Sequence, residues 1–247
     1  MENERSTPTP EEADERSKTG RKPDSSKLLS GGIKSWWVFL MKPIEDFLIE
    51  RKFRPNVLTI TTLVVSALAG WFFHLGMIFI AGVLLLAGST FDIFDGRVAR
   101  AQGLNSPKGA FFDSCVDRYS EVLIYLGLLS FFRDTFFIYI VFLLVSCSMM
   151  VSYTKARAEG LGIDCEVGTM QRAERVVYLG VLAAFNFLGN IVTFLMGLGN
   201  RDYLLKLSVI ILLLFSFYTS IERMAHVMGK MDDAGNGGTD GTAKAAD

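Results

Sequence analysis

The sequence has little of what several common classes of protein need. Its three cysteines follow no ligand spacing, so we expect reduced thiols or small apolar fillers rather than a metal or redox centre. Its 25 basic and 26 acidic residues leave a formal net charge of −1, which excludes bulk electrostatic attraction to nucleic acid. Residues 1–30 contain no apolar run, so no secretory signal peptide is predicted there.

Hydrophobic segments, in contrast, are long and numerous. Hydrophobic residues make up 50% of the chain, and its mean hydropathy is +0.33. Several segments approach the roughly 20 residues that cross a hydrocarbon core of about 30 Å. They are Asn56–Leu75, Met77–Asp95, Gly109–Phe132, Thr135–Tyr153, Val176–Phe194 and Tyr203–His226. We therefore predict an all-α integral membrane protein with six transmembrane helices.

The segments that flank this region are of two kinds. Ile33–Arg51 mixes aromatic and aliphatic residues with charged ones, which favours an N-terminal amphipathic helix in the membrane interface over an ordinary linker. Pro43 is expected to interrupt or kink that helix. Residues 1–32 and 229–247 are polar, contain Gly or Pro and lack aromatic residues, so both are predicted to be disordered tails around a membrane domain of residues 33–228.

Basic residues gather on one side of the predicted membrane. An even number of spans places both termini on the same side, together with the loops after the second and fourth spans. Because these loops are basic, the positive-inside rule places them and the termini in the cytoplasm, at the cytoplasmic (inner) membrane. Their basic residues are Arg97, Arg100, Lys108, Lys155, Arg157, Arg172 and Arg175.

Four aspartates stand at the cytoplasmic ends of the second and third predicted spans. A carboxylate within a bilayer costs roughly 2.5–3.5 kcal/mol, so four together require a partner that neutralises them. Asp92 and Asp95 are separated by a three-residue step, and Asp113 and Asp117 by a four-residue step. Those steps leave the side chains of each pair about 60° and about 40° apart on its helix. A short antiparallel turn through residues 100–108 then lets the two pairs face each other.

A site built from carboxylate oxygens alone favours Mg²⁺, with Mn²⁺ as the alternative, over Zn²⁺, which prefers nitrogen and sulfur. Two ions about 3.5–4 Å apart suit this number of ligands and are the arrangement used for in-line displacement at phosphorus. Two other interpretations stay open on the aspartates alone. In the first, the aspartates cap helices and balance the charge of the basic loops. In the second, they line the path of a divalent-cation transporter, which would place ionisable residues at mid-membrane depth in several spans.

The residues between the aspartates complete a longer signature. Asp92-x2-Asp95-Gly96-x2-Ala99-Arg100-x8-Gly109-x3-Asp113-x3-Asp117 specifies eight positions over 26 residues. It resembles, without gap or substitution, the signature of the CDP-alcohol phosphatidyltransferases. The resemblance covers roughly residues 33–228. It implies an enzyme in which a hydroxyl attacks the β-phosphorus of CDP-diacylglycerol, giving a phosphodiester lipid and CMP.

The resemblance also implies roles for individual residues. The implied metal ligands are Asp92, Asp95, Asp113 and Asp117. Asp117 is in addition the implied general base on the acceptor hydroxyl. The small Gly96 and Ala99 let a nucleotide lie against the helix, and Arg100 pairs with the diphosphate. The other positions implied to contact the CDP-lipid are Asn56, Thr59, Ser106 and Gly109. As plain helix-start and turn residues, Asn56 and Ser106 would be unremarkable.

A second basic cluster bears on the acceptor alcohol. Ser152-Tyr153-x-Lys155-Ala156-Arg157-Ala158-Glu159 with Arg172-x2-Arg175 resembles the branch that makes phosphatidylinositol phosphate, or its archaeal ether-lipid analogue, from inositol 1-phosphate. The residues implied to line the acceptor pocket are Ser152, Lys155, Arg172 and Arg175. Arg and Lys are the usual phosphate binders, although cytoplasmic loops are basic in any case. Ala173 stands where relatives often have Pro, and glycerol 3-phosphate is the alternative acceptor.

Glu121, one turn beyond Asp117, is interpreted as a buried paired carboxylate rather than a further ligand. The expected partners are CDP-diacylglycerol, a polar and phosphorylated alcohol, and membrane lipid, with no nucleic acid. The resemblance further implies a homodimer.

Overall fold

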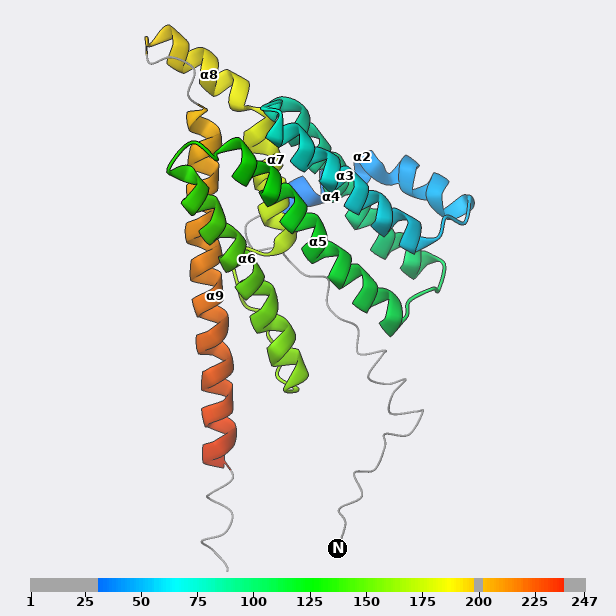
Figure 1. The fold of residues 1–247 in the computed structure, drawn as a ribbon. Coiled ribbons are helices and arrows are strands. Elements are labelled where there is room, and N and C mark those ends of the chain that lie inside the picture. The colour runs from blue at the N-terminus through cyan, green and yellow to red at the C-terminus, as the bar shows by residue number, and fades with distance from the viewer. Residues whose placement is uncertain (1–30, 198–201, 238–247) are drawn as a thin grey trace, which may run out of the picture.

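The computed structural model describes residues 31–197 and 202–237 of the chain (Figure 1). Its helices are α2 (Gly31–Glu50), α3 (Pro55–His74), α4 (Ile78–Ala101), α5 (Pro107–Phe131), α6 (Phe137–Gly160), α7 (Arg172–Ala184), α8 (Asn186–Leu195) and α9 (Tyr203–Gly237). The described residues contain no strand, which confirms the all-α prediction. The disorder predicted for residues 1–30 and 238–247 concerns residues outside the described part of the chain.

Local sequence signals account for several helix ends. Pro55 and Pro107 stand at the first positions of α3 and α5, where the missing N–H of proline is no loss. Pro43 lies inside α2 and does not interrupt it. The last helix continues to Gly237, into the segment 229–247 that we expected to be a disordered tail.

Within the described part of the chain, four helices have the length and apolar composition of membrane spans: α3, α4, α6 and the Tyr203–Asp233 part of α9. The count is five if α7 and α8, which meet at 41°, form one bent span. These are the helices of an integral membrane protein. α5 is not among them, because Asp117, Arg118 and Glu121 interrupt its apolar sequence. The count of six therefore stays a prediction.

The bend between α7 and α8 lies where α8 is tied to the start of α9. Asn186 Nδ2 donates to Asp202 Oδ1 at 2.8 Å, and Asn186 Oδ1 accepts from the backbone N–H of Leu205 at 3.1 Å. Asn190 donates to the same Asp202 oxygen at 2.8 Å. Because these bonds hold the first turns of α8 against the start of α9, the predicted span Val176–Phe194 is two helices.

Helix α3 is the common neighbour of the two helices that carry the aspartates. α4 and α5 each pack along α3 rather than along each other. The α3–α5 approach is a backbone contact, since a Cβ placed on Gly127 would lie 2.0 Å from the carbonyl oxygen of Gly70. Small residues permit such an approach between membrane helices. The two aspartate pairs therefore meet beside the start of α3 rather than across a simple two-helix hairpin.

The helices alternate in direction. The starts of α3, α5 and α7 and the ends of α4, α6 and α9 consequently lie at one end of the bundle (Figure 1). α2 packs beside this end through Leu48, which meets Leu58 and Phe94, and through an ion pair of 2.8 Å between Glu45 and Arg97. The main hydrophobic core lies farther along the bundle, among buried residues of α3 to α7 and α9.

Candidate active site

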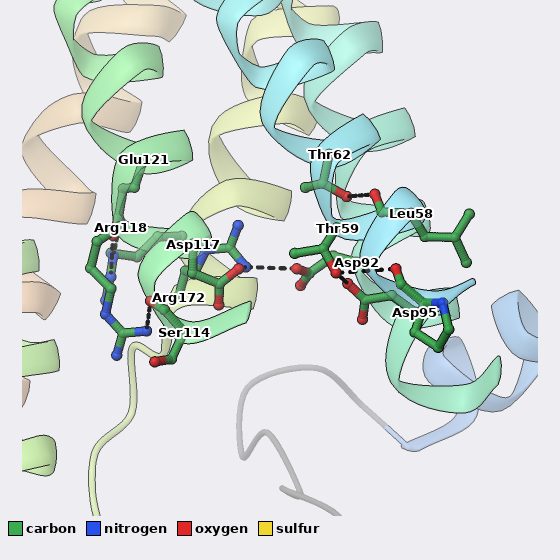
Figure 2. Close-up of polar contacts among 12 residues, drawn as sticks. Leu58, Thr59, Thr62, Asp92, Asp95, Ser114, Asp117, Arg118, Glu121 and Arg172 are labelled. Carbon is green, nitrogen blue, oxygen red and sulfur yellow. Dashed lines mark hydrogen bonds and ion pairs between the residues drawn. The ribbon is translucent and has the colours of Figure 1, made fainter. Parts of the chain in front are cut away.

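Three aspartates converge from two helices at this end of the bundle. Asp92 and Asp95 of α4 and Asp113 of α5 each offer a carboxylate oxygen, and these oxygens lie within 4.8 Å of one another. Asp95 is buried, and Thr59 of α3 donates to its Oδ2 at 2.8 Å (Figure 2). Asp113 Oδ1 is buried without a hydrogen-bond partner among the described residues. The convergence predicted from helical spacing is thus present for three of the four aspartates.

The fourth aspartate, Asp117, is linked to this group by an arginine. Arg172, the first residue of α7, places Nη1 2.9 Å from Asp92 Oδ1 and 2.5 Å from Asp117 Oδ1. Figure 2 shows its side chain between the two carboxylates. The exposed fractions of the Asp92 and Asp117 side chains are only 22% and 17%, so water screens these ion pairs weakly. Arg172 was predicted to line an acceptor pocket, and the structure places it against the aspartates.

The donor set fits a divalent cation of the magnesium and manganese kind. It consists of carboxylate oxygens, it includes an unpartnered buried oxygen on Asp113, and the described residues bring no histidine or cysteine to it. Hard cations of this kind prefer oxygen ligands. The cluster alone does not fix the number of ions.

Residues predicted to contact the CDP-lipid lie around the ends of α3, α4 and α5. Arg100 is exposed and folds back over Gly96. A Cβ placed on Gly96 would lie 3.5 Å from Nη1 of Arg100. Because the atoms nearest to that Cβ position belong to this flexible guanidinium, the helix surface beside Asp95 can open when the side chain turns away. Ser106 caps α5 by accepting from the backbone N–H of Gly109 at 3.1 Å. The remaining placements are Asn56 exposed on the first turn of α3, Thr59 buried against Asp95 and Ala99 half-buried on α4.

The structure places the residues predicted for the acceptor pocket in different environments. Ser152 and Lys155 are half-buried on the last turns of α6, and Arg172 contacts the aspartates. Arg175 is buried, and its Nε and Nη2 donate to the two carboxylate oxygens of Glu121 at 2.6 and 2.9 Å. Glu121 is thus the buried paired carboxylate that we predicted. The structure does not bring the Arg175 guanidinium to the surface.

Sequence reasoning passed over one buried cation, Arg223 of α9. Its Nη1 donates to Val151 O at 2.6 Å and its Nε to Val167 O at 2.8 Å, which ties α6 and the loop before α7 to α9. The signal was available, because a charged residue inside an apolar segment is costly and calls for a partner.

The comparisons with known proteins agree with this architecture. The sequence pattern of the CDP-alcohol phosphatidyltransferase family matches residues 52–217. The archaetidylinositol phosphate synthase of Methanothermobacter thermautotrophicus is 31% identical over 176 residues, which are 71% of this chain and 84% of the relative. The phosphatidylinositol phosphate synthase of Streptomyces avermitilis is 30% identical over 214 residues, which are 84% of this chain and 85% of the relative.

Solved structures of the phosphatidylinositol phosphate synthase of Mycobacterium tuberculosis are also similar. The structure with CDP-DAG bound has a TM-score of 0.63 and 26% identity, covering 75% of this chain and 92% of that chain. The structure in complex with manganese and citrate has a TM-score of 0.64 and 25% identity, covering 75% and 88%.

Proposed function

This chain belongs to the CDP-alcohol phosphatidyltransferase family, and on that premise we propose that it transfers the phosphatidyl group of CDP-diacylglycerol to inositol 1-phosphate, releasing CMP. The observation that carries the proposal is the convergence of Asp92, Asp95 and Asp113 with Asp117 at one end of the bundle. The choice of acceptor is supported by relatives named phosphatidylinositol and archaetidylinositol phosphate synthases.

The proposed metal is Mg²⁺, as two ions, with Mn²⁺ able to replace it. Asp92, Asp95 and Asp113 would hold the first ion, and Asp117 would share in binding the second. When bound, the ions neutralise the diphosphate and stabilise the departing CMP. The fit of the donor set and the manganese complex of the Mycobacterium tuberculosis enzyme support this assignment.

Asp117 is the proposed general base. It sits one turn beyond Asp113 on α5, at the edge of the carboxylate group, and its Oδ1 already binds a cationic hydrogen-bond donor from α7. An acceptor hydroxyl in that direction would give its proton to Asp117 as its oxygen attacks the β-phosphorus. The phosphodiester forms as the bond to CMP breaks, and CMP leaves as the phosphate monoester.

The two substrates would lie on opposite sides of the aspartates. For the CDP-lipid we propose the open surface of α4 around Gly96, with Arg100 turning from it toward the diphosphate. The other residues proposed for this side are Asn56, Thr59, Ala99, Ser106 and Gly109. For the acceptor phosphate we propose direct contact with Ser152, Lys155 and Arg172. Arg175 is predicted with them but is buried in its ion pair with Glu121, so it would contact the acceptor phosphate only when that pair opens.

The placement of the protein is part of the proposal. We propose that α5 is a span, because its residues 122–131 carry no charge and Ile124, Tyr125 and Leu128 among them are buried in the core. With α7 and α8 as one bent span, the total is six, and the site faces the cytoplasm at the inner membrane. α2 would lie in the interface, the membrane domain would be residues 33–228, and the enzyme would be a homodimer.

A turnover assay tests the proposed function. The purified full chain is incubated with CDP-diacylglycerol, Mg²⁺ and one of four acceptors: inositol 1-phosphate, glycerol 3-phosphate, inositol or serine. We expect CMP release with inositol 1-phosphate and far less with the others. Faster release with glycerol 3-phosphate would refute the acceptor. In the variant Asp117→Asn we expect turnover to be lost while Mn²⁺ and CDP-lipid still bind, and normal turnover would refute the assignment of the base.

A further inference from the structure

Arg172 bridges two of the four carboxylates. One nitrogen, Nη1, lies 2.9 Å from Asp92 Oδ1 and 2.5 Å from Asp117 Oδ1, so a single cationic group links α4 to α5 (Figure 2). Its Nε is buried without a hydrogen-bond partner among the described residues. The two carboxylates therefore hold the guanidinium in this position although one of its own donors stays unsatisfied.

The positions of the four carboxylates define where cations can bind while Arg172 contacts Asp92 and Asp117. Asp92, Asp95 and Asp113 bring their oxygens within 4.8 Å of one another, and Asp117 is not part of that group. A first cation fits the group of three. The proposed ligand of a second one is Asp117, whose Oδ1 is in contact with Arg172. A divalent cation and a guanidinium on the same carboxylates would repel each other strongly in a partly buried site.

We infer that Arg172 occupies the place of the second cation, and that it leaves Asp92 and Asp117 when that cation binds. The inference rests on the metal dependence proposed above. The Arg172 side chain borders a small cavity lined also by Thr62, Ser66 and Ser89. The hydroxyl oxygens of these residues are acceptors that a guanidinium can use.

The backbone that carries Arg172 is held in place independently of the Arg172 side chain. Glu174 accepts from the backbone N–H of Gln171 at 2.8 Å, which holds the start of α7 in place. Arg172 released from the aspartates then becomes available to the acceptor phosphate. Because coupling between two ligands is reciprocal, an acceptor phosphate that draws Arg172 away strengthens the binding of the second cation. The arginine thereby links acceptor binding to completion of the metal site.

Mn²⁺ binding tests the inference without turnover. The full-length protein in detergent is titrated with Mn²⁺ in the absence of CDP-lipid, and free Mn²⁺ is counted by electron paramagnetic resonance. We expect a tight and a weak class of sites in the wild type. In Arg172→Gln the weak class tightens by about tenfold or more, because a charge-assisted contact no longer competes, and the tight class, which shares only Asp92 with the arginine, tightens less. Arg172→Lys, which keeps the charge but not the planar fork, is expected to fall between the two.

A matched control separates contact from bulk charge. Arg118 lies next to Asp117 in the sequence, but its guanidinium donates to the carbonyl oxygen of Ser114 rather than to a carboxylate. Arg118→Gln removes the same charge without breaking a carboxylate contact, so it should tighten the weak class far less than Arg172→Gln does. An equal tightening in Arg118→Gln and Arg172→Gln would overturn the inference, and so would an unchanged or weakened second class in both Arg172 variants.

A second arm of the titration adds inositol 1-phosphate. In the wild type the weak class should tighten severalfold, and in Arg172→Gln this gain should shrink or vanish. The same gain in both proteins would show that the phosphate acts directly on the metal, which would overturn the coupling. If the wild type binds no Mn²⁺ at all, the proposed metal dependence itself fails. If Mn²⁺ binds equally in every variant, only the exchange fails.

Discussion

Arg175 and Glu121 form a two-pronged ion pair inside the bundle, with side chains that are 0% and 2% exposed. Tyr125 adds a hydrogen bond of 3.1 Å to Glu121, and Arg175 also donates to Met170 O at 3.1 Å. The pair joins α5 to α7 one turn away from Asp117 on the former helix. It therefore fixes the helix that carries the proposed base against the helix that carries the arginine between the aspartates.

Removing one member of this pair should destabilise the fold severely. Glu121→Leu leaves a buried guanidinium without its partner, which typically costs about 3–5 kcal/mol. The measurement is the free energy of unfolding in mixed micelles titrated with SDS. The double variant Glu121→Leu/Arg175→Met removes both charges and should recover most of the loss.

The matching control for the ion pair lies at the surface. Arg133 and Asp134 form a pair with side chains that are 62% and 87% exposed. Asp134→Ala should change the free energy of unfolding by less than about 1 kcal/mol. A loss in Glu121→Leu no larger than in Asp134→Ala would contradict the buried pair.

Metal removal should abolish turnover reversibly. Chelation with EDTA takes away the cation that stabilises the departing CMP, a contribution of several kcal/mol, so CMP release should fall by about a hundredfold or more. Excess Mg²⁺ or Mn²⁺ should restore it and Zn²⁺ should not, because the site offers only oxygen ligands. Turnover that persists in Asp113→Asn at full rate would contradict the use of the unpartnered Asp113 oxygen as a ligand.

Helical spacing was enough to predict that the aspartates meet, but not what else meets them. The three-residue step points Asp92 and Asp95 the same way from their helix, and the four-residue step does the same for Asp113 and Asp117; both depend only on local geometry. The contact of Arg172 with Asp92 joins residues 80 positions apart, and the pair of Arg175 with Glu121 joins residues 54 apart. No periodicity encodes such partners. Both arginines could therefore be placed near a phosphate pocket by resemblance, while their carboxylate partners appear only in the folded chain.

The fold, like the site, was predictable where it depends on local sequence. Apolar segments of span length predicted the helices, because burial in lipid requires length and composition that are visible locally. The break between α7 and α8 was not predictable, since it depends on Asn186 reaching Asp202 at the start of another helix. The close packing of α3 against α5 was not predictable either, because it depends on Gly70 and Gly127 facing each other.

Acceptor recognition should be separable from donor recognition. Lys155 stands half-buried on the last turns of α6 and is proposed to contact the acceptor phosphate. Loss of one charge-assisted phosphate contact is worth about 1.5–3 kcal/mol, so Lys155→Ala should raise the KM for inositol 1-phosphate by about tenfold or more. The KM for CDP-diacylglycerol should stay within about threefold.

The control for Lys155 is a nearby cation on the same helix. Arg157 is exposed, and Arg157→Ala removes an equal charge from the same end of α6. It should leave both KM values within about threefold, because exposed charges act weakly at a distance. Equal weakening of both substrates in Lys155→Ala would place the lysine outside the acceptor pocket.

The glycine contact between α3 and α5 should matter for both stability and chemistry. A Cβ at Gly127 would meet the backbone oxygen of Gly70 at 2.0 Å, and a backbone atom cannot rotate aside as a side chain does. Gly127→Ala should therefore lose about 3 kcal/mol, the upper end of the usual cost of overpacking. Gly160→Ala, at a helix position with nothing within 4 Å, should stay within about 1 kcal/mol of the wild type.

The effect on chemistry follows from what the two helices carry. α3 holds Thr59, the hydrogen-bond donor to Asp95, and α5 holds Asp113. Forcing the helices apart at Gly127 separates the carboxylates that converge beside α3, so Mn²⁺ affinity should fall in Gly127→Ala at temperatures where the protein is still folded. Unchanged Mn²⁺ affinity together with a lowered free energy of unfolding would mean that the glycine contact stabilises the bundle without setting the geometry of the aspartates.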